Sequence, residues 1–199
     1  MRTTSRFPFV VAILSTLAGC VSDRTVHKDV PLVWLVGQES AVAVAAGVAP
    51  IRIRVEPLLD RRQDPKVIGM NVKNAASPLP VTTRDDVAAW STDRFKHVLA
   101  RQGFEIVESG EEIILDVEIL KLVVIEAGMF NGSAEFGVQA SDANGRLIWR
   151  GTLAGKSKRW GRTNNLDNYY EALQNAFESA ASKLGETPGF MDALWARSR

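Results

Sequence analysis

The sequence predicts an α+β domain: a mostly antiparallel sheet with a three-stranded meander and two amphipathic helices packed on one face. Three observations support this prediction. Apolar and polar residues alternate, as in half-buried strands, through residues 113–119 and again through residues 130–140. Residues 87–99 and 166–184 instead carry apolar side chains at helical spacing. Strands, helix, meander and helix, in that order, are typical of helices gathered on one side of a sheet.

The first part of the chain carries short β signals. Residues 30–36 are apolar enough for a strand or for a segment lying along the domain, and the small apolar residues 41–49 fit either a strand or a loop. At residues 51–55, isoleucine and valine alternate with two arginines, which predicts a half-buried strand. Residues 67–70 favour a second strand, and residues 71–83, with two prolines, favour a loop.

A helix follows this loop. Thr82 or Thr83 is expected to cap it, because Asp85 and Asp86 then fall in the first turn, where backbone amides favour negative charge. Gly103 is expected to end the helix. Its apolar face is expected to comprise Val87, Trp90, Phe95, Val98 and Leu99.

The second part of the chain predicts the meander and the remaining helices. The pair Asn144-Gly145 favours a tight type I′ hairpin between the second and third strands of the meander. The third strand is expected at residues 147–160, and residues 190–196 favour a short last helix.

The chain begins with a signal-peptide layout in residues 1–19. Two arginines precede an apolar run that ends in small residues. This run is too short to cross a bilayer, since a spanning helix needs about 20 apolar residues. Cys20, the single cysteine, directly follows Leu-Ala-Gly19. This arrangement resembles the lipobox of bacterial lipoproteins, which implies cleavage between Gly19 and Cys20 and a diacylglyceryl group on the Cys20 thiol.

The predicted organisation has three parts: a lipoprotein signal peptide at residues 1–19, the acylated cysteine and a tether at residues 20–31, and a single periplasmic α+β domain at residues 32–199. In the lipobox resemblance, Val21 in place of an aspartate implies the outer membrane, with the domain facing the periplasm. Cleavage removes two of the 24 basic residues and none of the 23 acidic ones, so the mature formal charge is −1. A nearly neutral domain argues against a nucleic-acid partner.

Several short motifs carry a family resemblance. They are a strand running into the turn at residues 60–62, a helix that opens at residues 82–85 and ends at residues 100–104, a long strand, and the Asn144-Gly145 hairpin. Together they resemble the YajG-type family of bacterial lipoproteins, whose members are largely of unassigned function and supply no catalytic residues to carry over. A looser similarity is to the auxiliary lipoproteins of envelope lipid-transport systems.

The sequence contains no pattern that predicts an enzyme. The run from Gly151 to Ser157 is one residue short of a phosphate-binding P-loop and continues a strand pattern, so no nucleotide site is expected. His97 has no convergent nucleophile pattern around it, and Asp116 and Glu118 share a strand face as solvated carboxylates would. No metal and no cofactor are expected beyond the covalent lipid on Cys20.

Two basic segments are candidate partner-binding sites. In the turn Asp60-Arg61-Arg62, the arginines suit a phosphate or carboxylate of a lipid, glycan or protein. The alternative is that Asp60 stabilises the turn and pairs locally with one arginine. Lys156 and Lys158 are a second candidate for anionic headgroups, or else charges that protect a sheet edge.

These observations predict a membrane-anchored, non-enzymatic lipoprotein that binds an envelope partner, a protein or peptidoglycan, from the periplasmic face. The alternative is an auxiliary lipoprotein of a lipid-transport system with an apolar groove for lipid between helix and sheet. The aromatic residues available to line such a groove are Trp90, Trp149, Trp160, Tyr169 and Tyr170.

Overall fold

The computed structural model describes residues 27–39, 51–163 and 165–196. The predictions for the signal peptide, for Cys20 and for residues 41–49 therefore lie outside the described residues. Within the described part of the chain, none of the helices has the length and hydropathy needed to cross a bilayer.

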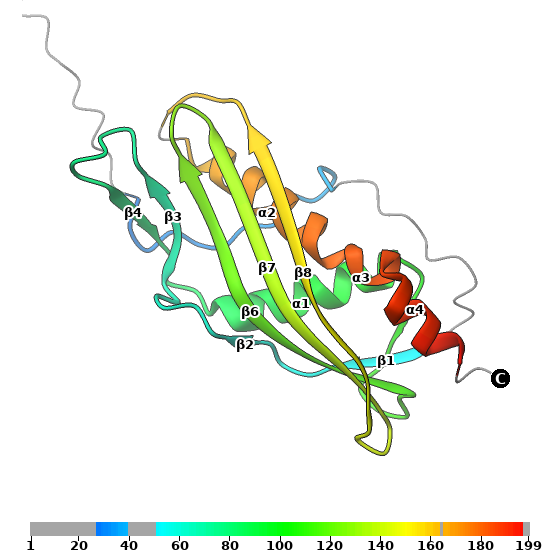
Figure 1. Cartoon of the computed structure of the whole chain (residues 1–199). Helices are drawn as coiled ribbons and strands as arrows, with labels where there is room; N and C mark the ends of the chain where they lie inside the picture. The colour runs from blue at the N-terminus through cyan, green and yellow to red at the C-terminus, as the bar shows by residue number, and fades with distance from the viewer. Residues whose placement is uncertain (1–26, 40–50, 164, 197–199) are drawn as a thin grey trace, which may run out of the picture.

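Three long antiparallel strands form the main part of the sheet (Figure 1). They are β6 (Ile113–Glu126), β7 (Phe130–Asp142) and β8 (Leu147–Arg159), each joined to the next by a hairpin. The alternating apolar residues point to one side, where Leu115, Val117, Ile119, Phe136 and Val138 are almost fully buried. The predicted meander is confirmed.

The other edge of β6 pairs with short strands from the first part of the chain. β1 (Arg52–Val55), β2 (Leu59–Asp60) and β3 (Val67–Asn71) lie one after another along β6, all parallel to it. β5 (Glu105–Ile106) continues the sheet beyond β1, also in parallel, and β4 (Leu79–Thr82) pairs with β3 in antiparallel. Most paired residues are nevertheless antiparallel, as predicted, because the meander strands are much longer.

The prediction of a loop through residues 71–83 is wrong at β4. This strand contains Pro80, which a sheet accepts at its margin because proline has no N–H for a second neighbour. The outer side of β4 is bonded by the chain near Val30, whose N–H donates to the Thr82 carbonyl over 2.9 Å.

The predicted N-terminal cap of the first helix is wrong. α1 (Val87–Arg101) is capped by Asp86, which accepts from the Ala89 N–H over 3.0 Å, rather than by Thr82 or Thr83. Thr83 instead donates its hydroxyl to the Val30 carbonyl over 2.7 Å, so tertiary contact takes this side chain away from the helix end.

The hairpin at Asn144-Gly145 is not the predicted type I′ turn. Gly145 has a φ of +78°, but Asn144 is not among the described residues with positive φ, which a type I′ turn requires. The Gly145 N–H donates to the Asp142 carbonyl over 2.8 Å, and the Asp142 N–H donates to the Arg146 carbonyl over 2.9 Å. This is a three-residue loop with a left-handed glycine at its end.

The helices cover a single face of the sheet (Figure 1). α2 (Leu166–Ala181) packs on β7 and β8, α1 packs beside it, and the short α3 (Lys183–Glu186) and α4 (Pro188–Trp195) follow. The contact between α2 and the sheet is close: a Cβ on Gly155 would lie 2.3 Å from the Ala176 carbonyl oxygen, and one on Gly132 would lie 2.2 Å from that of Ala172. Gly132 in β7 and Gly155 in β8 therefore allow the close packing of α2, and the predicted α+β class is confirmed.

The chain at residues 27–39, called the N-terminal strap below, lies across the two long helices. Trp34 is 7% exposed, and its ring centroid lies 5.9 Å from that of Phe177. The Gln174 amide accepts from the Leu35 N–H over 2.7 Å and donates to the Leu35 carbonyl over 3.3 Å. The apolar stretch here thus lies along the domain, one of its two predicted interpretations.

A buried polar group joins α2 to the end of β6. The Tyr169 hydroxyl donates to Glu126 Oε2 over 2.7 Å, and Asn71 Nδ2 donates to the same oxygen over 3.0 Å. Burial, and then the bond to Glu126 and its charge, raise the pKa of Tyr169 far above its ordinary value of 10.0. Tyr169 is therefore protonated in the folded protein at any ordinary pH.

The raised pKa of Tyr169 predicts a loss of stability in alkali. The unfolded chain releases this proton near pH 10.0 while the folded protein retains it, so the contribution of Tyr169 to stability is constant below that pH and falls above it. The expected slope from this group is about 1.4 kcal/mol per pH unit. Urea unfolding at several alkaline pH values measures this slope. Tyr169→Phe is expected to remove the contribution of this one proton from the slope. Tyrosinate absorbance from Tyr169 near pH 10.0 in folded protein would contradict this assignment.

Candidate functional site

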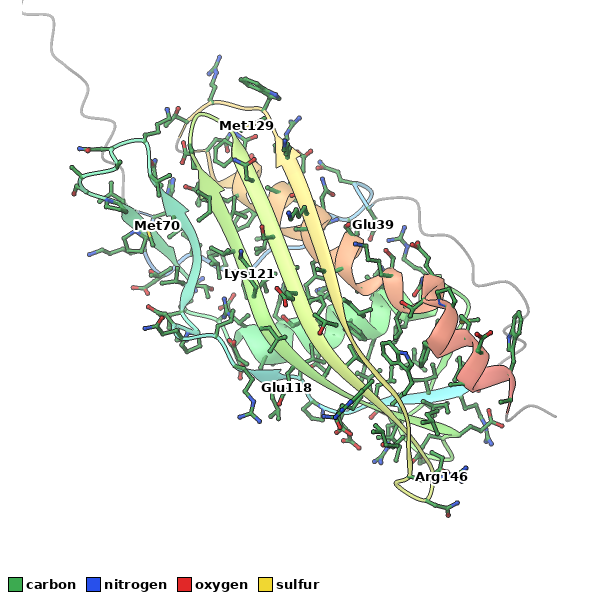
Figure 2. All side chains as sticks on the ribbon, viewed as in Figure 1. Glu39, Met70, Glu118, Lys121, Met129 and Arg146 are labelled. Carbon is green, nitrogen blue, oxygen red and sulfur yellow. The ribbon has the colours of Figure 1, made fainter. Side chains whose placement is uncertain are left out.

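The face of the sheet opposite the helices is the main candidate for a functional surface. No element of the described chain covers it, and Figure 2 views it with the helices behind. Side chains that alternate with the core residues point outward here. They form two rows across the meander, because Gln139 pairs with both Asp116 and Arg150, and Gly137 pairs with both Glu118 and Thr152.

These rows form the floor of a groove of about 740 Å³. Its rim comes from Glu56 and Pro57, which follow β1, and from Leu59 in β2. The Leu59 side chain is 54% exposed there. The groove thus combines three carboxylates, from Glu56, Asp116 and Glu118, with the Arg150 guanidinium and an apolar rim. Such a lining suits a polar polymer or peptide that supplies both hydrogen bonds and some apolar contact.

The turn after β2 contains a buried arginine clamp. Arg62 Nε and Nη2 donate to the two Asp60 carboxylate oxygens over 2.9 and 2.7 Å. Nη1 donates to the carbonyl oxygens of Val67 and Leu122 over 2.8 and 3.0 Å. Nη2 also donates to the Pro65 carbonyl oxygen over 2.7 Å. These bonds use all five guanidinium N–H groups. The Arg62 and Asp60 side chains are only 7% and 10% exposed. The pair therefore holds the turn against β6 and leaves no Arg62 donor for an outside anion.

Arg61, the other arginine of the turn, faces solvent. Its side chain is 58% exposed, and its Nε lies 3.0 Å from Glu118 Oε1 on the groove floor. Lys156 and Lys158 are exposed on the same sheet face but lie farther along β8. The structure therefore separates the predicted partner-binding residues into one at the groove, two along β8 and two buried in the clamp.

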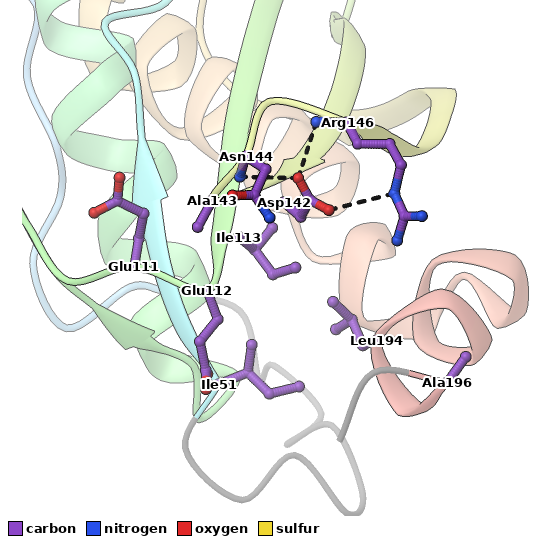
Figure 3. Close-up of a pocket in the computed structure, with 10 residues that line it drawn as sticks. All are labelled: Ile51, Glu111, Glu112, Ile113, Asp142, Ala143, Asn144, Arg146, Leu194 and Ala196. Atoms are coloured by element: carbon purple, nitrogen blue, oxygen red, sulfur yellow. Dashed lines mark hydrogen bonds and ion pairs between the residues drawn. The ribbon is translucent and has the colours of Figure 1, made fainter. Parts of the chain in front are cut away.

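A second hollow, of about 510 Å³, lies at the end of the sheet that carries the β7–β8 hairpin (Figure 3). Its apolar wall includes Ile51, Ile113 and Leu194. The carboxylate of Asp142 beside it accepts from the backbone N–H of Arg146 over 2.9 Å and pairs with the Arg146 Nε over 3.4 Å (Figure 3). This carboxylate therefore stabilises the hairpin, and we regard the groove as the stronger candidate.

The titratable residues considered for catalysis lie on different faces. His97 is on α1, in the helix layer, where its Nε2 lies 3.5 Å from Glu39 Oε1 of the N-terminal strap. Asp116 and Glu118 lie on the open face of the sheet. The structure does not bring the histidine and the carboxylates together. In the described ranges, no three His, Asp or Glu side chains are grouped as metal ligands would be.

The aromatic residues expected to line a lipid groove are dispersed. Tyr169 and Tyr170 are buried, and Trp90 packs on Phe177 within the helix layer. Trp149 packs on α4, whereas Trp160 is 73% exposed. Because α2 also contacts the sheet at backbone distance, these side chains do not line one groove between helix and sheet.

The groove was only partly visible in the sequence. Alternation placed Asp116 and Glu118 on one face of their strand and Arg150 on a face of another strand, but Gln139 and Thr152 carry no local signal of a site. Glu56 joins them only because β1 and β2 run along β6. Pairing between distant strands therefore assembles this surface.

Comparison with known proteins defines the class of fold. No protein-family model matches the sequence, and the comparison with curated proteins finds no match. The structure is similar to protein XCC0632 from Xanthomonas campestris, of the family DUF330, with a TM-score of 0.51 and 10% identity over 86% of this chain and 94% of that chain. An uncharacterized protein gives a TM-score of 0.51 and 9% identity over 81% and 98% of the two chains.

A weaker likeness is to a minor lipoprotein from Acinetobacter baumannii, with a TM-score of 0.42 and 9% identity over 71% of this chain and 94% of that chain. At these identities, the two stronger similarities establish a shared fold and nothing about activity.

Proposed function

We propose that this protein is a membrane-anchored lipoprotein of the bacterial envelope, without enzymatic activity, that binds a protein or peptidoglycan through the open face of its sheet. The signal sequence is cleaved between Gly19 and Cys20, and the lipid on Cys20 anchors the chain. Val21 favours the outer membrane, with the domain in the periplasm. The groove on a sheet face that no described element covers is the observation that supports partner binding best.

The lining of the groove favours recognition over chemistry. Opposite charges lie near one another, with Arg61 beside Glu118 of the groove floor and Arg150 in the row that contains Asp116. Solvated charges of both signs can exchange water for the polar groups of a peptide or glycan, and they give specificity and orientation more than affinity. This function needs no cofactor, nucleotide or nucleic acid.

Site-specific crosslinking in cells tests the proposal. A photoreactive residue at Thr152, on the groove floor, is expected to capture a protein or a peptidoglycan fragment that mass spectrometry identifies. Asp93, which is exposed on α1 on the far side of the sheet, provides the matched control. Arg150→Glu, which replaces the guanidinium of the groove with a fourth carboxylate, is expected to abolish the adduct at Thr152. Equal capture at Thr152 and Asp93, or capture unaffected by Arg150→Glu, would contradict binding at this groove.

A further inference from the structure

The end of β8 and the turn that follows it combine four cations with an exposed tryptophan. Lys156, Lys158, Arg159 and Arg162 are all exposed, and residues 156–162 contain no acidic residue. Arg159 Nε lies 2.8 Å from Glu171 Oε2 on α2, which partly neutralises this guanidinium. Trp160 is 73% exposed, which is unusual for so large an aromatic side chain on a protein surface that faces water. We call these five residues the basic-aromatic end.

Other segments meet at this same end of the sheet. The β6–β7 hairpin carries Met129, which lies at the opposite end of the molecule from Arg146 (Figure 2). Lys73, from the loop between β3 and β4, donates to the Thr163 hydroxyl just beyond the basic-aromatic end. A further cation thus adjoins the cluster from a distant part of the sequence.

The start of the described chain also lies close to this end. The His27 ring centroid is 6.1 Å from that of Tyr169, which is 5.0 Å from that of Phe130. Phe130 pairs with Arg159 across β7 and β8. His27 is therefore separated from the basic-aromatic end by about two aromatic side chains.

Chain length then limits where the membrane can be. Cys20 lies seven residues before His27. An extended chain spans at most about 3.6 Å per residue, so the acylated sulfur lies within roughly 25 Å of His27. The lipid anchor therefore enters the bilayer near this end of the domain.

We propose that the basic-aromatic end rests on the anionic surface of the membrane, with Trp160 among the headgroups and the surrounding cations on lipid phosphates. This inference rests on the proposed anchor at Cys20. Tryptophan is enriched at membrane interfaces because its ring is apolar while its N–H is polar. Protection of a sheet edge would explain lysines on β8, but it gives no reason for an exposed tryptophan beside them.

The arrangement has a consequence for the partner-binding groove. β8 ends at the basic-aromatic end, and Arg150 lies eight residues before Lys158 on the same strand. At ~3.3 Å per residue, the groove lies roughly 25 Å farther along the strand from the membrane contact. The docked end therefore holds the groove away from the bilayer surface.

Depth-dependent fluorescence quenching tests this orientation. The mature acylated protein is reconstituted into vesicles of phosphatidylethanolamine and phosphatidylglycerol with brominated acyl chains, which quench tryptophans near the bilayer. We expect Trp160→Phe to remove most of the quenching. Trp195→Phe is the matched control, because Trp195 is 45% exposed on α4, and it is expected to leave the quenching unchanged.

A charge variant tests the role of the cations. Each lysine or arginine near an anionic surface favours contact about fivefold, since it contributes about 1 kcal/mol. Lys158→Glu combined with Arg162→Glu is therefore expected to abolish the quenching of Trp160 while the protein still floats with the vesicles through its acyl chains.

The outcomes separate this inference from the proposed anchor. Failure of the acylated protein to float with vesicles, or equal flotation of Cys20→Ser protein, would overturn the anchor and with it the orientation. Normal flotation with quenching that is insensitive to Trp160→Phe would overturn the orientation alone. Quenching that is unchanged in purely zwitterionic vesicles would overturn the role assigned to the cations.

Discussion

Replacing Arg62 with alanine is expected to lower the free energy of unfolding by about 3–5 kcal/mol, as when one partner of a buried ion pair is removed. The substitution leaves the Asp60 carboxylate, only 10% exposed, without its guanidinium. It also leaves the carbonyls of Pro65, Val67 and Leu122 without this donor. Urea unfolding of the mature chain, followed by far-ultraviolet circular dichroism, measures the loss.

The neighbouring arginine provides the control. Arg61 is 58% exposed and forms a single ion pair with Glu118, so Arg61→Ala is expected to change stability by about 0.5 kcal/mol or less. Equal effects of the two substitutions would show that the clamp does not stabilise the fold. Crosslinking studies of this turn should therefore use Arg61, because substitution of Asp60 or Arg62 would disturb the fold itself.

Replacing Gly155 with alanine is expected to destabilise the protein by about 3 kcal/mol, at the upper end of the usual range for overpacking. The added Cβ would lie 2.3 Å from the Ala176 carbonyl oxygen and 2.3 Å from the Ala180 nitrogen. Both atoms belong to the α2 backbone, so a rotamer change cannot relieve the contact. The helix must move away from β8, and the close contact between the two layers is lost.

Gly137 is a matched control on the other face of the same sheet. A Cβ there would lie 3.5 Å from Leu120 Cδ1, an ordinary contact. Gly137→Ala is expected to change the free energy of unfolding by about 0.5 kcal/mol or less. Thermal unfolding of the two variants in parallel compares the faces, and similar losses at both positions would argue against helix packing as the reason for Gly155.

Sequence reasoning failed where a local motif had a competing tertiary partner. Thr83 has the chemistry of a helix cap, but its hydroxyl donates to the Val30 carbonyl, and Asp86 caps α1 instead. The Asn144-Gly145 pair predicted the right hairpin but the wrong turn, because Asp142 accepts bonds that extend the loop by one residue. In both cases the position of the element was right and its terminal hydrogen bonds were not.

The candidate site shows the same division. Alternation placed Asp116 and Glu118 on a solvated strand face, and the structure confirms that placement. It could not distinguish Arg61 from Arg62, because the two adjacent residues have the same side chain and differ only in whether Leu122, Val67 and Pro65 surround them.

The sequence by itself determined the α+β class, the meander and the two amphipathic helices. Each depends on the spacing of apolar residues within one segment, because burial of the apolar face stabilises the segment wherever it packs. Only the tertiary structure decided that β1, β2 and β3 run parallel along β6 and that Arg62, which donates to the Leu122 carbonyl, is buried. These features depend on contacts between residues far apart in the chain, and no periodic pattern in the sequence of either segment predicts such a contact.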